Sequence, residues 1–385
     1  MYIAKMAIST VIIRVLALLS TNFLLSCSIQ VNPIIEEEQL LWISGQDNIG
    51  VYRIPLLTYT PKGHLLAICE ARKNGGGDSG PKFLATRRSE DAGQTWKTQE
   101  FVLNDGPIVD GLNLGVVIVD DITSTIFIFY QVCGHYVQCN ISTQYYIKSM
   151  DDGVTWTQPY NVSKQIGTKV FAGGPGYGIQ KKHAPHIGRL ILCGHSTLPG
   201  DGLFCLLSDD HGDTWRYGGM VKSIPYNTAK VKGDFVPDEC QPLELPDGSI
   251  MVNVRNQYQY HCHCRMIFMS YDGADSFKTD DLRFDTTLVD PTVAAAILYH
   301  QGVLFFTNPE SDTHRINMTL RWSYNNGTTW AGSLPVWSKD SGYSTMTAIP
   351  NNVQDSKYIY ILYEKGQVSS TQYLSLVKVS LTGDL

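Results

Sequence analysis

The chain has 385 residues, of which 43% are hydrophobic and only 17% are charged, against about 25% charged in an average globular protein. This composition excludes a disordered chain, and 34 Gly and 17 Pro are too few for a fibrous one. The formal net charge of −6 argues against nucleic acid as a partner, because phosphate binding needs clustered Lys and Arg.

The first 28 residues predict a secretory signal peptide. Two basic residues flank the start of an apolar core over 15–25, and the small residues Ser26 and Ser28 permit cleavage after residue 28. The core is too short to span a bilayer comfortably. Two alternatives stay open: a signal anchor that is retained, or lipidation of Cys27, since Leu-Leu-Ser-Cys loosely resembles a bacterial lipoprotein cleavage box.

Cysteines and glycosylation sequons agree with export. Eight cysteines remain after cleavage, and an even number in an exported chain permits disulfides whose pairing stays open. The four sequons, each with Ser or Thr two residues on, begin at Asn140, Asn161, Asn317 and Asn326.

An internal repeat dominates the chain. The pattern Ser-x-Asp-x-Gly-x-Thr-Trp is intact at 89–96, 149–156 and 208–215, and degraded copies lie at 270–277 and 323–330. The starting serines are 60, 59, 62 and 53 residues apart. In each copy the Asp, or Asn325 in the last, can accept hydrogen bonds from turn amides, the Gly supplies positive φ, and the Trp or Phe opens the outgoing strand. We therefore expect five β-hairpins.

The predicted strands surround these turns. In chain order they cover 83–86, 116–119, 126–130, 144–147, 204–207, 265–268, 303–307, 358–363 and 373–381. No stretch shows sustained helical periodicity. The 357 residues after the signal, divided by a spacing near 59, give six repeats. We expect an all-β fold: a single six-bladed β-propeller with Asp-box hairpins over residues 29–385.

Residues that break the repeat are candidates for a grafted site. Arg255 lies 15 residues before its box, a phase that holds no arginine in the other repeats, and Arg53 precedes the first box without a counterpart. Arg321 lies two residues before its box, but Arg87 shares that phase, so the pattern does not choose between them.

The motifs of this chain resemble those of the sialidase family, and most of all the lysosomal sialidase (sialidase-1) group. Asp boxes alone are unspecific, because sortilin-type receptors carry them too. The resemblance covers nearly everything after about residue 42. It rests on Tyr52-Arg-Ile-Pro, Glu70-Ala-Arg-Lys, Asp110-Gly-Leu-Asn-Leu-Gly, Pro237-Asp-Glu-Cys-Gln-Pro, Arg255-Asn-Gln, Tyr260-His-Cys-His-Cys-Arg, Leu320-Arg-Trp-Ser, Ser341-Gly-Tyr-Ser and Tyr363-Glu-Lys-Gly.

The resemblance assigns substrate-binding residues. Sialic acid carries a carboxylate on its anomeric carbon, which guanidiniums hold with charge-assisted, partly bidentate bonds. The resemblance implies that Arg53, Arg255 and Arg321 form this triad, which settles the choice against Arg87, and that Glu364 steadies Arg53.

The resemblance also assigns the catalytic residues. A carboxylate nucleophile would be repelled by the substrate carboxylate, and sialidases are recognised for using a tyrosine instead. By resemblance Tyr343 is the nucleophile, Glu239 is the base that activates it, and Asp78, in a glycine-rich loop, is the general acid/base.

Two further residues receive weaker assignments. Arg72 resembles a family position near the substrate carboxylate and the acid loop. Asp110 would bond a sugar hydroxyl or the acylamino group, with an ordinary turn role as the alternative. His-Cys-His-Cys at 261–264 suggests zinc, but alternating side chains on a strand cannot close one tetrahedral site, so we expect disulfide-bonded or packed cysteines there. As a sialidase the chain is expected to need no metal or organic cofactor.

The sequence thus predicts an exo-α-sialidase that releases terminal sialic acid from glycoproteins, oligosaccharides or glycolipids with retention. A sialic-acid-binding lectin, a trans-sialidase and a structural Asp-box receptor domain are the alternatives. The resemblance implies a lysosomal location, an acidic working pH and a protective carboxypeptidase partner of the cathepsin A type. The chain ends Val-Ser-Leu-Thr-Gly-Asp-Leu, without the group's tyrosine-based tail, so an extracellular or membrane-associated location stays open, as does the oligomeric state.

Overall fold

The computed structural model describes residues 30–104, 108–167, 172–195, 202–223, 236–350 and 355–382. The predicted signal peptide over residues 1–28 and the alternatives for Cys27 lie outside these ranges. Met1–Val31 and Asn32–Leu385 form two separate units, and the description below concerns the second. Its described residues contain two short helices, α2 (Ser163–Ile166) and the 3-10 turn η1 (Thr279–Asp281), and none of the described helices could cross a membrane.

In each of the first two sheets, four strands that are consecutive in the chain pair in an antiparallel arrangement. The first contains β2 (Val51–Tyr59), β3 (Leu65–Arg72), β4 (Lys82–Ser89) and β5 (Glu100–Asn104). The second contains β6 (Leu112–Asp120), β7 (Thr125–Val132), β8 (Thr143–Ser149) and β9 (Tyr160–Asn161), and β11 (Gly176–Tyr177) adds to β6 in parallel.

The next two sheets are built in the same way. The third contains β13 (Leu190–His195), β14 (Gly202–Ser208) and β15 (Arg216–Lys222), with β10 (Ala172–Gly173) and β12 (Ile179–Gln180) both pairing with β13. The fourth contains β16 (Pro237–Glu244), β17 (Ile250–Asn256), β18 (Cys264–Ser270) and β19 (Arg283–Val289).

The last sheet has seven strands because one long strand is shared. Its order is β1 (Ile34–Ile43), β25 (Tyr373–Ser380), β24 (Tyr358–Lys365), β23 (Gly332–Thr347), β22 (Ile316–Ser323), β21 (Val303–Pro309) and β20 (Ala296–His300). The first part of β23, up to Asp340, pairs with β22, and the rest, from Ser341, pairs with β24.

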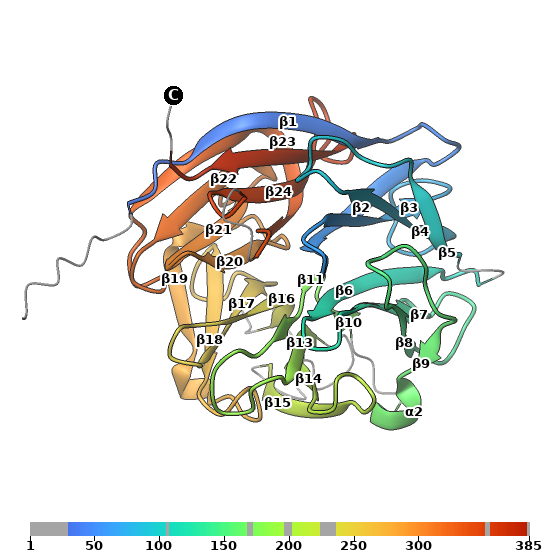
Figure 1. Ribbon diagram of the computed structural model, residues 1–385, viewed down its shortest axis with the longest axis horizontal. Coiled ribbons are helices and arrows are strands. Elements are labelled where there is room, and N and C mark those ends of the chain that lie inside the picture. Colours follow the sequence, from blue (N-terminus) through green and yellow to red (C-terminus); the bar gives the residue numbers. More distant parts are fainter. Residues whose placement is uncertain are drawn as a thin grey trace, which may run out of the picture. The chain divides into compact units, whose positions relative to one another are not determined.

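The sheets follow one another around a common centre within this unit, in the arrangement of a β-propeller (Figure 1). Neighbouring sheets pack face to face: Leu66 and Ile68 of the first sheet share a buried cluster with Val117 and Ile128 of the second. All four of these side chains are fully buried, and each such burial contributes about 1.5–3 kcal/mol. The all-β prediction is confirmed.

The predicted hairpin turns have the expected hydrogen bonds. In all five boxes the Asp, or Asn325 in the last, accepts a hydrogen bond of 2.8–3.0 Å from the backbone amide four residues on. The residue before the glycine position also has positive φ, as at Ala92 with 55°. In the degraded fourth box Ala274 occupies the glycine position with a φ of 69°, a conformation costly for any residue with a Cβ. Trp215 is buried, and the other four box aromatics are partly buried.

Three disulfides resolve the pairing that the sequence left open. They join Cys133 to Cys139, Cys193 to Cys240 and Cys262 to Cys264, while Cys69 and Cys205 are free and buried. The expectation of disulfide-bonded cysteines in the His-Cys-His-Cys motif is therefore confirmed. Among the sequons, Asn140 and Asn326 are exposed, and Asn161 and Asn317 are partly buried.

We expect the disulfide between Cys193 and Cys240 to contribute most to stability, because it spans 47 residues and links β13 to β16, in different sheets. Closing a loop of this length lowers the entropy of the unfolded chain and thereby raises the unfolding free energy by about 4 kcal/mol. The double variant Cys193→Ala/Cys240→Ala should lose about that much unfolding free energy in urea titrations under two-state conditions. The matched control, Cys133→Ala/Cys139→Ala, spans only six residues and should lose about half as much. Equal losses in the two variants would contradict this expectation.

Candidate active site

Four of the predicted site residues line one cavity of about 560 Å³. Asp78 comes from the loop after β3, Glu239 from β16, Arg255 from β17 and Tyr343 from β23. Glu239 and Arg255 come from one sheet, Tyr343 from the seven-stranded sheet and Asp78 from a loop of the first sheet, and the propeller brings them together in one cavity.

Tyr343, Glu239 and Arg255 form a hydrogen-bonded group in this cavity. The Tyr343 hydroxyl donates to Glu239 Oε1, and Arg255 Nη1 lies 2.6 Å from Glu239 Oε2 and 3.4 Å from the Tyr343 hydroxyl. Burial, with the negative charge of Glu239 beside it, raises the pKa of Tyr343, while the guanidiniums of Arg255 and Arg53 oppose the rise. The phenol is therefore neutral at rest, and the carboxylate that can take its proton is already in contact with it.

Glu364 organises the other side of the tyrosine. Its buried carboxylate accepts from Arg53 Nε at 2.9 Å, from the Ile54 amide at 3.2 Å and from the Tyr343 amide at 3.0 Å. Gly342 permits this approach, since a Cβ there would lie 2.2 Å from Glu364 Oε2. Glu364 thus fixes Arg53 as the sequence prediction expects, and it also fixes the backbone at Tyr343.

Asp78 is held at the cavity mouth by two arginines. Its Oδ1 lies 3.0 Å from Arg72 Nη1 and 3.6 Å from Arg53 Nη1, although its side chain is 65% exposed. Burial would raise the pKa of Asp78, but the guanidiniums of Arg72 and Arg53 outweigh it and lower the pKa. Arg72 also donates to the carbonyl of Gly77 at 2.9 Å and to Glu70 at 2.9 Å, so it ties the glycine-rich loop to β3.

Arg321 does not lie where the sequence prediction expects it. Its guanidinium is bound to Glu310 Oε1 at 2.5 Å and to Asn308 Oδ1 at 3.4 Å, and it is absent from the described lining of the cavity. Arg315 lies near the tyrosine instead, although neither it nor Arg53 lines the cavity: its guanidinium is 5.6 Å from the centre of the Tyr343 ring, on which Arg53 also lies, at 5.1 Å.

The comparison of equivalent positions among the repeats, which singled out Arg255, also singles out Arg315. It lies eight residues before its box, where the other four repeats carry Pro81, Ile141, Gly200 and Cys262. The position is therefore unique to one repeat, as expected of a grafted site residue.

Asp110 is fully buried and supports a loop of the cavity rather than lining it. Its carboxylate accepts from the amides of His135 at 2.9 Å and Val137 at 3.3 Å, and His135 lines the cavity. This geometry fits the turn role that the sequence left open. Asp110 with Cys133 and Cys139 is the one group of metal-ligand spacing among the described residues, and both sulfurs are in a disulfide.

Sequence reasoning also missed a His–Asp pair in the cavity wall. His195 Nε2 lies 2.9 Å from Asp238 Oδ1, and the same oxygen accepts from the Glu239 amide at 2.8 Å. Burial alone would lower the pKa of His195, but the charge of Asp238 outweighs it and raises the pKa. The Cys193–Cys240 disulfide lies next to both partners along the chain, so it holds this pair beside Glu239.

Comparison with known proteins identifies the family of this chain. The model of the BNR repeat-like domain matches residues 63–358. A sialidase of Micromonospora viridifaciens is 32% identical over an alignment of 364 positions that covers 86% of this chain and 52% of that protein. Sialidase-2 of Cricetulus griseus is 25% identical, covering 76% of this chain and 77% of that one. Among solved structures, the Hadza microbial sialidase Hz136 has a TM-score of 0.72 at 25% identity, over 88% of this chain and 67% of that one. The chain thus spans about half the length of the Micromonospora protein.

Proposed function

This chain belongs to the sialidase family, and from that premise we propose that it is an exo-α-sialidase that cleaves terminal sialic acid from glycans with retention of anomeric configuration. The observation that carries the proposal is the contact between the Tyr343 hydroxyl and Glu239 under two flanking guanidiniums. A phenol with an adjacent base and surrounding cations suits attack on a substrate that carries its own carboxylate.

The substrate carboxylate would be held by Arg53, Arg255 and Arg315. Arg53 and Arg315 both lie within 5.6 Å of the Tyr343 ring centre, and Arg255 contacts the hydroxyl. Arg315 thereby takes the place that the resemblance gave to Arg321. Three guanidiniums thus converge on one buried ring, and in this structure Arg53 is paired with Glu364 and Arg255 with Glu239.

In the first step the Tyr343 oxygen bonds to the anomeric carbon as its proton passes to Glu239. The glycosidic bond breaks, and the leaving oxygen takes a proton from Asp78. In the second step water attacks the anomeric carbon and the bond from that carbon to the Tyr343 oxygen breaks. Asp78 accepts a proton of the water, and the proton on Glu239 returns to the Tyr343 oxygen. Each step inverts the anomeric carbon, so the product retains the configuration of the substrate.

The propeller is proposed to have six blades. The first four sheets supply one blade each, and the seven-stranded sheet supplies two, because β23 pairs with β22 up to Asp340 and with β24 from Ser341. The last blade would then combine β23, β24 and β25 with β1.

The test measures the release of sialic acid from sialyllactose, with proton NMR used to identify the anomer of the product during the first minutes. We expect the α anomer to appear first, and kcat/KM to fall with rising pH already within the acidic range. Asp78 must be protonated to act as an acid, and its lowered pKa places the loss of that proton at a lower pH than for an ordinary aspartate.

Arg72→Gln is the control for the pH profile. Removing this guanidinium should raise the pKa of Asp78 and move the falling limb of kcat/KM to higher pH. An unchanged limb would show that Asp78 does not set it. Binding of sialyllactose without turnover would favour the lectin, and transfer to added lactose would favour the trans-sialidase.

Location and partners are proposed on sequence grounds alone. We propose export through the secretory pathway with glycosylation at the sequons, a lysosomal destination, and sialylated glycans as substrates, with a cathepsin A-type carboxypeptidase as the partner to be tested.

A further inference from the structure

A second cavity of about 470 Å³ lies toward the other end of β16 and β23, and it shares no lining residue with the candidate active site. Along β16, Glu239 lines the first cavity and Glu244 the second, and along β23 Tyr343 lines the first and Thr347 the second. Four or five residues of extended strand separate the two by roughly 13–17 Å. The segment Ala172–Gln180 lies between them, since its beginning lines the first cavity and its end lines the second.

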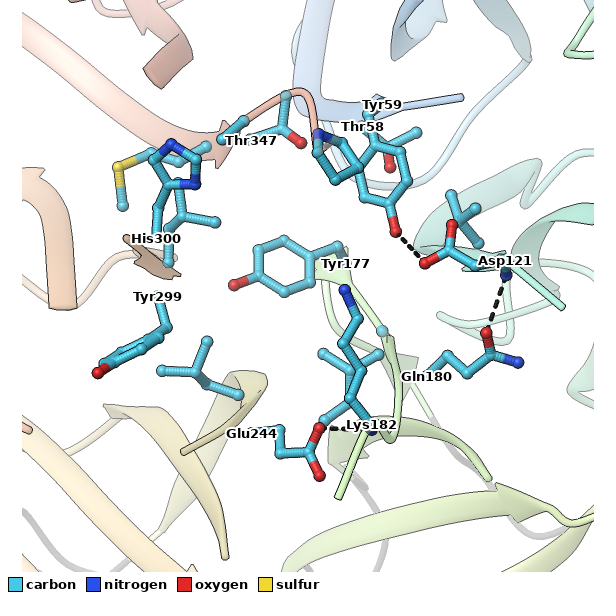
Figure 2. Close-up of a pocket in the computed structure, with 18 of the residues that line it drawn as sticks. Thr58, Tyr59, Asp121, Tyr177, Gln180, Lys182, Glu244, Tyr299, His300 and Thr347 are labelled. Carbon is cyan, nitrogen blue, oxygen red and sulfur yellow. Dashed lines mark hydrogen bonds between the residues drawn. The ribbon is translucent and has the colours of Figure 1, made fainter. Parts of the chain in front are cut away.

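The walls of this second cavity are apolar and aromatic. Three tyrosine rings surround it, Tyr59, Tyr177 and Tyr299 (Figure 2), together with aliphatic side chains that include Leu243 and Leu298. The hydroxyls of two of the tyrosines are already engaged: Tyr59 donates to Asp121 Oδ2 at 2.8 Å, and Tyr177 donates to the carbonyl of Ile297. Their rings therefore present mainly apolar faces to an occupant.

The two carboxylates at the wall are already bonded within the protein. Glu244 accepts from Lys181 Nζ at 2.8 Å, from the Lys182 amide at 2.6 Å and from the His183 amide at 3.0 Å. Asp121 is bound by Tyr59. Neither carboxylate is left without a donor, so the cavity has little to offer to a cation or to a polyhydroxylated sugar.

The Lys182 ammonium is the exception. Its side chain is exposed, it makes no hydrogen bond or ion pair with any residue that the structure describes, and Figure 2 shows it reaching between the tyrosines toward the middle of the cavity. An unpaired cation over apolar walls attracts a group with a single anionic end.

We propose that this cavity binds a small anionic amphiphile, a molecule with one carboxylate or sulfonate and an apolar ring or chain. The anionic group pairs with the Lys182 ammonium, and the apolar body packs against Tyr177, Leu243 and Leu298. The site is separate from the sialidase chemistry and would exist even if that chemistry were absent.

The test uses two fluorescent probes on the full chain: 1-anilinonaphthalene-8-sulfonate and its uncharged analogue N-phenyl-1-naphthylamine. We expect saturable one-to-one binding of the sulfonate. Lys182→Gln should weaken the sulfonate about 10-fold or more, the value of a charge-assisted bond, and leave the uncharged probe unchanged. Leu298→Trp, which fills the cavity, should weaken both probes.

The matched control is Lys164→Gln, an exposed lysine in α2 that does not line the cavity and should alter neither probe. Thermal unfolding midpoints should agree among the variants, so that the probes do not report loosened packing. Displacement of the sulfonate by sialyllactose would place it on the active-site arginines and overturn the proposal. So would non-saturable binding, or equal affinity in Lys182→Gln.

Discussion

Tyr343→Phe is expected to lose on the order of 10²- to 10⁴-fold in kcat while KM changes little. The variant removes the one oxygen that contacts both Glu239 and Arg255, and it keeps the ring on which the Arg53 and Arg315 guanidiniums lie. Steady-state kinetics on sialyllactose measure the loss. The fold should survive, because Glu239 keeps its 2.6 Å contact with Arg255.

Tyr363→Phe is the matched control for this variant. Tyr363 is also buried, and its hydroxyl also bonds a glutamate, Glu38, at 2.8 Å, but it does not line the active-site cavity. We expect Tyr363→Phe to keep kcat within a few-fold and to lower stability by about 1 kcal/mol. If both variants lost turnover equally, the loss would reflect impaired folding. If Tyr343→Phe kept full activity, Tyr343 would be excluded as the nucleophile.

Arg315→Ala is expected to lower kcat/KM by about 10- to 100-fold, the value of one charge-assisted contact to the substrate carboxylate. Arg321→Ala should leave kcat/KM within a few-fold, because Arg321 is bound to Glu310 and Asn308. Arg321 is only 4% exposed, so its variant should instead lower the unfolding free energy. Kinetics and urea titration of the pair separate the two roles, and the opposite result would restore Arg321 to the triad.

The hairpins could be predicted from sequence because their chemistry is local. A box of eight residues contains the serine, the carboxylate and the glycine position that make the turn, and its repetition gives the spacing of the sheets. The active site is not local. Tyr343 and Glu239 lie 104 residues apart and meet only because the propeller brings β16 and β23 to one cavity, so the resemblance and not the periodicity named them.

The difference between the predicted and the observed place of Arg321 has the same origin. The resemblance was carried by the motif around Leu320, but motif membership does not specify which way a side chain points. Arg321 lies inside β22 and faces Asn308 of the neighbouring strand β21. Arg315 lies just before β22 begins, and its guanidinium donates to the Thr292 carbonyl at 2.9 Å and lies over the Tyr343 ring. The change of partner along β23 was not predicted either, because no motif in its 16 residues marked the point where pairing passes from β22 to β24.

The pairing of β1 with β25 has a consequence for biosynthesis. Ile34 lies opposite Ser380, and the Asn32 amide donates to the Leu381 carbonyl at 2.8 Å. β1 is therefore synthesised more than 300 residues before the strand that pairs with it. The hairpins between them can form during translation, but this sheet can be completed only after β25 has been synthesised. A chain truncated before Tyr373 would therefore leave β1 without its partner strand.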